Sequence, residues 1–216
     1  MTTYIISGGQ LDLSFVRELL EQDENPCIIA ADRGVEACVQ LQLTPDYIIG
    51  DFDSVSDKGK EFIRQFGGTT VPLQPVKDDT DTEAALHLAF EKTQGDIVIL
   101  GGTGTRLDHV MGNLSILMQG IAKARRVILM DPYNRIRVVA DHVSIKKTEQ
   151  FGRYVSVFPM GDRAEGVTLE GFFYPLQDAV LMGDSSLGVS NEIVGEIAKI
   201  SVRKGCLLVI ESRDEK

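Results

Sequence analysis

The chain has 216 residues, of which 43% are hydrophobic and 25% charged, and its formal net charge is −10. This length allows one large domain or two small ones, and the composition is that of an ordinary soluble protein. The acidic balance, with no run of Lys or Arg, argues against a nucleic-acid-binding surface. No apolar run approaches the roughly 20 residues of a membrane span. We therefore expect neither a nucleic-acid nor a membrane partner, and we expect a polyanionic substrate to arrive with a cation.

The N-terminus and the cysteines indicate a cytoplasmic protein. The first ten residues, "MTTYIISGGQ", lack a basic segment and are interrupted by glycines, which predicts a first strand rather than a signal peptide. Cys27, Cys38 and Cys206 are odd in number, far apart and without a CxxC motif. This spacing suggests neither disulfides nor a zinc site.

Up to about residue 131, short apolar runs alternate with amphipathic segments. Repeated strand–helix units predict a parallel sheet with helices on both faces. The expected strands are Tyr4–Ser7, Cys27–Ala31, Tyr47–Gly50, Thr69–Val71, Asp96–Leu100 and Arg126–Met130.

Two of the intervening segments have a clear helical period. In "TDTEAALHLAF", Leu86, Ala89 and Phe90 recur at helical spacing, and Thr80 with Glu83 predicts a capping box. The segment after Arg106 predicts a helix with one apolar stripe. Its expected members are Leu107, Val110, Met111, Leu114, Leu117 and Met118.

The pattern changes after "DPYN" at residues 131–134. The runs "RIRVVA", "RYVSVF" and "AKISVR" alternate polar and apolar residues, and glycine-containing turns separate them. We therefore expect an α/β domain at residues 1–134 and a smaller all-β domain, a sandwich or barrel-like unit, at residues 135–216.

The expected strands of the α/β domain end in glycine pairs or aspartates. They are followed by "SGGQ", "ADRG", "GDFDS", "KDDTD" and "GGTGTRLDH". Ligands of open parallel sheets bind at the carboxyl ends of the strands, so these segments are predicted to share one crevice. The carboxylates brought there are Asp32, Asp51, Asp53, Asp78, Asp79, Asp81 and Asp108.

So many carboxylates in one crevice would raise one another's pKa values unless a hard cation lies among them. Oxygen ligands without His or Cys partners favour Mg²⁺ or Ca²⁺ over zinc, and Mg²⁺ with substrate phosphates is the simplest interpretation. The structural alternative makes Asp32 and Asp78 or Asp79 helix N-caps and Asp81 a first-turn carboxylate. That alternative is weakest for Asp51 and Asp53, because an Asp-x-Asp after a strand cannot cap a helix with both side chains.

The segment "GGTGTR" at residues 101–106 opens a helix, so its amides could hold a phosphate; an ordinary strand-to-helix turn is the alternative. It is neither a Walker A loop nor a GxGxxG dinucleotide fingerprint. Arg106 could bind a phosphate or lie at the surface. His109 is expected to support the site rather than to transfer protons.

Four motifs together resemble the bacterial thiamin pyrophosphokinase family: "PDYIIGDFDSV", "KDDTDTEAAL", "GGTGTRLDHVMGN" and "GVSNE" at residues 188–192. Each motif alone is weak, but their order and separation over nearly the whole chain are specific. The resemblance implies a Rossmann-like α/β domain for ATP and Mg²⁺ and a β-sandwich domain for thiamin and dimerisation. It also implies transfer of pyrophosphate from ATP to thiamin, in a homodimer whose sites lie at the subunit interface.

The resemblance also implies roles for individual residues. Asp51, Asp53, Asp81, Asp108 and Arg106 correspond to catalytic positions, and Asp51, Asp53, Asp78 and Asp81 to metal ligands. The nucleotide pocket corresponds to Gly8, Gly9, Asp32, Gly101, Gly102, Thr103, Gly104, Thr105 and His109. Ser190 and Asn191 correspond to residues associated with thiamin recognition, whereas their composition alone favours two turn formers in a loop.

Two departures and two other functions stand beside this resemblance. Thr105 occupies a position where a small residue is common, and the chain has no Trp to stack on thiamin, so Phe, Tyr or Met would have to do so. "GDFDSV" also fits the nucleophile motif of haloacid-dehalogenase-type phosphatases, although that motif usually follows the first strand and its partner motifs are not evident. A non-catalytic Mg²⁺–nucleotide sensor is the third possibility.

Overall fold

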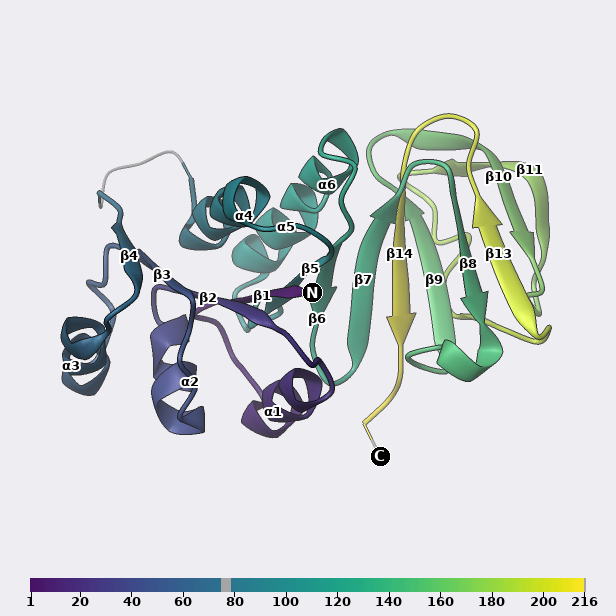
Figure 1. Ribbon diagram of the computed structural model, residues 1–216. Coiled ribbons are helices and arrows are strands. Elements are labelled where there is room, and N and C mark those ends of the chain that lie inside the picture. The colour runs from purple at the N-terminus through teal and green to yellow at the C-terminus, as the bar shows by residue number, and fades with distance from the viewer. Residues whose placement is uncertain (75–78, 216) are drawn as a thin grey trace. The chain divides into compact units, whose positions relative to one another are not determined.

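The computed structural model describes residues 1–74 and 79–215 (Figure 1). The chain divides into two compact units, Met1–Pro132 and Tyr133–Lys216, which are described separately below. Among the described residues, none of the helices has the length and apolar character needed to cross a membrane.

Unit 1 is built on a sheet in which every strand pairing is parallel. Its strands are β1 (Thr3–Ile6), β2 (Cys27–Ala31), β3 (Tyr47–Gly50), β4 (Thr69–Pro72), β5 (Ile97–Leu100) and β6 (Val127–Met130). All the residues of β1, β2 and β5 are buried. Strands covered on both faces read as continuous apolar runs, which is why the predicted strands agree with these to within one residue at each end.

Helices cover both faces of this sheet, as predicted. They are α1 (Leu13–Glu21), α2 (Gly34–Leu41), α3 (Asp57–Gln65), α4 (Asp81–Lys92), α5 (Leu107–Ile116) and α6 (Gln119–Ala122). α1 to α3 lie on one side of the sheet and α4 to α6 on the other (Figure 1). Leu86 and Ala89 of α4 are fully buried, as the helical period predicts.

The strand order locates a natural ligand crevice. The order is β6-β5-β1-β2-β3-β4, so the chain leaves β1 toward β2 and later returns to the other side of β1 as β5. The loops after β1 and β5 therefore run in opposite directions away from the sheet and leave a crevice between them.

Two predicted details of the helices need correction. Leu107 and Met111 are 76% and 62% exposed, while Asn113, Ile116 and Leu117 are buried, so the predicted apolar stripe of α5 is wrong at its first turns. The Thr80 hydroxyl does cap α4 by accepting a hydrogen bond from the Glu83 backbone N–H. The Glu83 carboxylate, however, accepts from Gln119 Nε2 at 2.6 Å. Among the described residues, only the Thr80 half of the capping box is therefore seen.

Unit 2 consists of two antiparallel sheets, with strand orders β12-β9-β14-β7 and β11-β10-β13-β8. The strands are β7 (Asn134–Val139), β8 (His142–Lys146), β9 (Tyr154–Pro159), β10 (Arg163–Glu170), β11 (Leu176–Met182), β12 (Asn191–Glu192), β13 (Ile197–Ser201) and β14 (Leu207–Ser212), with the 3₁₀ turn η1 (Lys147–Glu149) after β8. Buried residues from both sheets form one core, which makes this unit a sandwich rather than a barrel.

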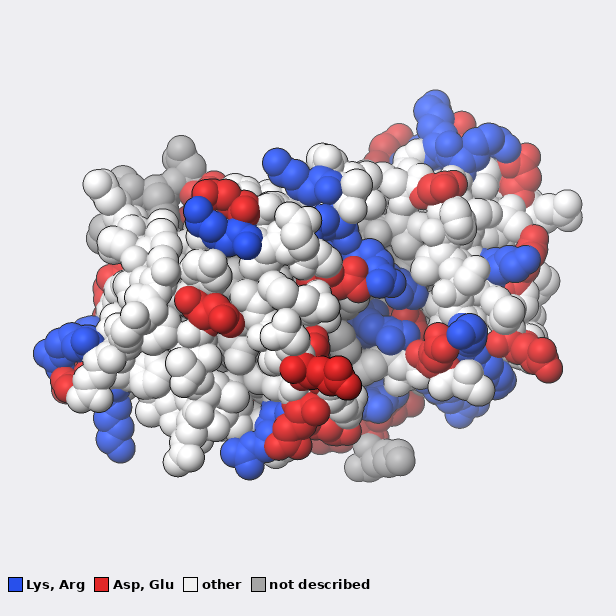
Figure 2. Space-filling view, viewed as in Figure 1, with Lys and Arg blue, Asp and Glu red and all other residues white. Residues whose placement is uncertain are grey.

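Charged side chains of both signs are distributed over unit 1. On the face drawn in Figure 2, much of this unit is uncharged, and its acidic and basic side chains lie in small separate groups.

Candidate active site

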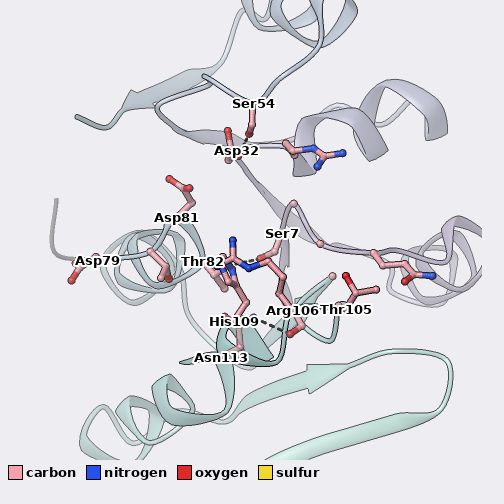
Figure 3. A pocket seen from close by; sticks show the side chains of 18 of the residues that line it. Ser7, Asp32, Ser54, Asp79, Asp81, Thr82, Thr105, Arg106, His109 and Asn113 are labelled. Carbon is pink, nitrogen blue, oxygen red and sulfur yellow. Dashed lines mark hydrogen bonds between the residues drawn. The ribbon is translucent and has the colours of Figure 1, made fainter. Parts of the chain in front are cut away.

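A cavity of about 670 Å³ opens at the carboxyl ends of the strands of unit 1. Its lining comes from the segments that follow β1, β2, β3 and β5 and from the start of α4, as the strand-end argument predicts (Figure 3). The lining residues are Ser7, Gly8, Gly9, Gln10, Asp32, Arg33, Asp51, Ser54, Asp79, Thr80, Asp81, Thr82, Gly101, Gly102, Gly104, Thr105, Arg106, His109 and Asn113.

The loop after β3 presents two carboxylates in a tight turn. Phe52 between them has φ of 61°, a left-handed conformation that is costly for an aromatic residue. Asp51 Oδ1 accepts a hydrogen bond from the Asp53 backbone N–H at 3.2 Å, which closes the turn locally. The turn holds one Asp51 oxygen, and the Asp53 side chain is exposed.

Asp32 lies beside this turn at the end of β2. It adopts a left-handed conformation with φ of 46°, and its Oδ2 accepts from the Ser54 hydroxyl at 2.5 Å. Its Oδ1 is buried and has no hydrogen-bond partner among the described residues. Burial, followed by the negative charges of Asp81 and Asp51, raises the pKa of this carboxyl, while hydrogen bonds from Ser54 and the Arg33 N–H oppose the shift.

Asp32, Asp51 and Asp53, here called the acidic trio, fit a hard divalent cation. One oxygen from each lies within 4.8 Å of the others, and no nitrogen or sulfur ligand belongs to the group. A buried carboxylate oxygen without a donor is expensive, and a cation is what would satisfy it. The donor set is the one that Mg²⁺ prefers. The trio includes Asp32, which the strand-end pattern placed among the carboxylates around a cation and the family resemblance assigned to the nucleotide pocket.

The start of α4 supplies further carboxylates to the cavity. Asp79 and Asp81 line it, and Asp81 is close enough to act electrostatically on Asp32. Asp78 lies outside the described residues. The N-cap of α2 is Arg33 and that of α4 is Thr80, so the interpretation of Asp32 and Asp79 as helix caps is wrong.

Two glycine segments, Gly8–Gly9 after β1 and Gly101–Gly104 after β5, approach each other beside β1, where the strand order reverses. A Cβ built on Gly9 would lie 2.1 Å from the Gly101 carbonyl oxygen, and Gly101 itself has φ of 74°. No side chain fits at Gly9, and the left-handed backbone favours glycine at Gly101. Gly8, Gly102 and Gly104 also line the cavity, whereas Thr103 of the same loop does not.

Arg106 precedes α5 and is paired with Asp108. Arg106 Nε and Nη2 donate to the two Asp108 carboxylate oxygens at 3.2 and 2.5 Å. The Asp108 carboxylate also accepts from the His109 N–H, and the Arg106 contact, as the largest cause, holds the pKa of Asp108 at about 2. Arg106 and His109 line the cavity and Asp108 does not. The structure therefore places Asp108 beside Arg106, on the outer side of the site.

Several lining residues were not predicted from the sequence. Ser7 Oγ and Thr82 Oγ1 lie 2.9 Å apart and link the loop after β1 to α4. Asn113 Nδ2 donates to the Gly102 carbonyl at 2.9 Å. Asn113 stands out in the sequence as a polar residue inside an apolar period. Gln10, Arg33 and Ser54 belong to the strand-end segments predicted to share the crevice, but none was singled out as a site residue.

Ser190 and Asn191 belong to unit 2. Ser190 has φ of 55°, and its N–H donates to Ser156 Oγ. Asn191 is 3% exposed, and its carboxamide accepts from the Tyr174 and Glu192 N–H groups and donates to the Tyr174 carbonyl. Asn191 thus fixes the backbone of Tyr174, whose ring and that of Phe173 are exposed and pack edge to face.

The sequence matches two family models, described as the thiamin pyrophosphokinase catalytic domain, over residues 18–129, and the thiamin pyrophosphokinase vitamin B1 binding domain, over residues 142–207. It is 33% identical to a thiamine pyrophosphokinase of Bacillus subtilis over 99% of both chains, and 25% identical to thiamine pyrophosphokinase 1 of Oryza sativa over 82% of this chain and 69% of that one.

The solved structures agree with these matches. The fold superposes on a crystal structure of Bacillus subtilis thiamine pyrophosphokinase with a TM-score of 0.89 and 30% identity, over the whole of both chains. It also superposes on yeast thiamin pyrophosphokinase with a TM-score of 0.80 at 16% identity, over 97% of this chain and 85% of that one, which shows the shared fold. The chain belongs to the thiamin pyrophosphokinase family.

Proposed function

We propose that the chain uses the cavity of unit 1 to transfer a pyrophosphoryl group from ATP to the hydroxyl of thiamin, giving thiamin diphosphate and AMP. The observation that carries this proposal is the meeting of three carboxylates and two glycine segments at one edge of a parallel sheet. The reversal of strand order beside β1 is the usual position of a nucleotide in Rossmann-like sheets, and we describe unit 1 as one.

The acidic trio would hold Mg²⁺, which supplies neutralising charge for the phosphates of ATP. The amides of the glycine loop, residues 101–105, and the guanidinium of Arg106 bind phosphate oxygens. Asp108 holds Arg106 in place through its bidentate pair. Such a transfer depends mainly on in-line positioning and charge stabilisation, so the chain need not form a covalent intermediate.

The thiamin hydroxyl attacks the β-phosphorus of ATP, and AMP leaves. The hydroxyl proton passes to a carboxylate of the cavity. Asp108 is poorly suited to accept it, because its pKa of about 2 makes it a weak base at neutral pH. We therefore assign Asp108 to the support of Arg106 and leave the base among the carboxylates that line the cavity.

Thiamin also needs an apolar surface, which the cavity of unit 1 does not offer. The part of the cavity that the structure describes contains no Phe, Tyr or Met. Exposed apolar side chains occur on unit 2, among them Phe173 and Tyr174, and on α5 of unit 1, where Leu107 and Met111 are exposed but do not line the cavity. We propose that unit 2 of a second copy completes the site, in a homodimer, with Ser190 and Asn191 beside the thiamin rings.

The free thiols of Cys27, Cys38 and Cys206 support a reducing, cytoplasmic location.

Incubation with ATP, Mg²⁺ and thiamin tests the proposal. We expect AMP and thiamin diphosphate in equal amounts. Release of inorganic phosphate without thiamin diphosphate would instead indicate a phosphatase of the haloacid-dehalogenase type, and no turnover would indicate a nucleotide sensor. The family match supports neither of these alternatives.

A further inference from the structure

The glycine loop, residues 101–105, is held by very few hydrogen bonds. Among the described residues, the only hydrogen bond to its backbone is the one from Asn113 Nδ2 to the Gly102 carbonyl, at 2.9 Å. Backbone amides in a partly buried loop need partners, and this loop leaves several N–H groups without one. Unsatisfied amides beside a helix N-terminus are the donors that an anionic group would use.

Asn113 is placed to fix the direction of these donors. It lies on the second turn of α5, is only 8% exposed, and lines the same cavity as Gly102 and Gly104 (Figure 3). Peptide units are planar and trans, so a carbonyl held on one side directs the N–H of the next residue to the opposite side. The contact at Gly102 O therefore sets the direction of the Thr103 N–H.

The neighbourhood of Gly102 leaves little freedom for another arrangement. A Cβ on Gly102 would lie 2.5 Å from Leu129 Cδ1 and 3.1 Å from Asn113 Nδ2. The loop is thus pressed against β6 on one side and bonded to α5 on the other. Arg106, which follows the loop directly, is the N-cap residue of α5 and takes its position from the same segment.

We infer that Asn113 is a positioning residue for phosphate binding: its carboxamide holds the Gly102 carbonyl so that the remaining amides of the glycine loop can bind a phosphate of the nucleoside triphosphate. This inference rests on the proposed function, since the triphosphate is the ligand of that site. It adds a role for a side chain that need not touch the substrate.

The test uses two variants and a matched control on the same helix. Asn113→Leu keeps the branched shape and removes the donor, and Asn113→Ala removes the whole carboxamide. Ser115→Ala is the control, since the Ser115 side chain is exposed and, within the part of the chain that the structure describes, bonds only to the Met111 carbonyl of its own helix. Wild-type turnover of ATP and thiamin is measured first, and its absence would count against the proposed function itself.

With an active wild type, we expect both Asn113 variants to raise the KM for ATP about tenfold, as the loss of one buried hydrogen bond would. The KM for thiamin should change less than twofold. Hydrogen exchange of the peptide containing residues 101–105 should become faster in both variants, and tripolyphosphate should protect it in the wild type. Ser115→Ala should behave as wild type in every measurement.

An unchanged KM for ATP with unchanged exchange of this peptide would overturn the inference. Equal changes in both KM values together with a general increase in exchange over unit 1 would also overturn it, because they would show a purely structural role. If Asn113→Ala does not fold, the same KM and hydrogen-exchange measurements on Asn113→Leu decide between these outcomes.

Discussion

The close approach of the two glycine segments gives a prediction whose size follows from the structure. Gly9 has an ordinary backbone conformation, so Gly9→Ala adds only a methyl group, 2.1 Å from the Gly101 carbonyl oxygen. Ordinary contact begins at 3.4 Å. The loops after β1 and β5 must therefore separate by about 1.3 Å, the difference between 3.4 and 2.1 Å, before the methyl group fits.

A displacement of this size should reduce catalysis more than stability. Misplacement of a substrate by about 1 Å can cost about 100-fold in rate, whereas overpacking costs about 1–3 kcal/mol of unfolding free energy. We expect Gly9→Ala to lower kcat/KM for ATP about 100-fold. Its Tm should fall by about 2–12 °C, because each 1 kcal/mol shifts the Tm of a chain of this length by roughly 2–4 °C.

Gly112→Ala is the matched control. Gly112 is exposed on α5, does not line the cavity, and has no atom within 4 Å of its added Cβ. Initial rates of AMP formation at varied ATP, with thermal melts of both variants, measure the effect. Wild-type kinetics in Gly9→Ala, or an equal loss in Gly112→Ala, would refute the account of this crevice.

Four further predictions concern the charges of the site and unit 2. Asp51→Asn and Asp81→Asn should each lower kcat at least about 100-fold, a loss of about 2.7 kcal/mol of transition-state stabilisation, without a parallel fall in Tm. Asp162→Asn, in an exposed turn, is the control. Near-normal turnover in both Asp51→Asn and Asp81→Asn would remove these carboxylates from the mechanism. Chelation should abolish turnover, and Mg²⁺ should restore it; activity that survives full chelation would contradict a metal-dependent site. The Asp108 carboxyl carbon should titrate in NMR with a pKa of about 2, and in Arg106→Met this pKa should rise toward 3.8. The Arg106–Asp108 pair is therefore broken by protonation when the pH falls through the lowered pKa. An unchanged titration midpoint in Arg106→Met would show that Arg106 does not lower the pKa of Asp108. Asn191→Ala should lose three hydrogen bonds, which costs about 3 kcal/mol of unfolding free energy, and should raise the KM for thiamin about tenfold with little change in the KM for ATP. When this variant is mixed with Asp51→Asn, heterodimers should recover some activity. If no activity returns although the subunits exchange, the site lies within one chain.

The strands of unit 1 were predictable because parallel strands covered on both faces are continuous apolar runs bounded by polar residues. The same reasoning placed Asp32, Asp51 and Asp81 at one edge, since the ends of parallel strands must meet there. Helix α5 was less predictable. Its period contains two overlapping apolar stripes, and only tertiary packing decides that Ile116 and Leu117 are buried while Leu107 and Met111 are not.

The partners of the site residues could not be predicted because they depend on distances across the fold. Ser54 meets Asp32 from another loop, and the Ser7–Thr82 contact spans β1 and α4. Asn191 illustrates the same limit. The family resemblance associated Asn191 with thiamin recognition, and the structure adds three hydrogen bonds from its carboxamide to the backbone of Tyr174 and Glu192.

The fate of the ATP phosphates tests the central claim most directly. With ATP labelled separately at the β- and γ-phosphorus, we predict that both labels appear in thiamin diphosphate, that AMP carries neither, and that no label remains on the protein. Transfer of the γ-label alone, or a hydroxylamine-sensitive label on Asp51, would contradict direct pyrophosphoryl transfer in this site.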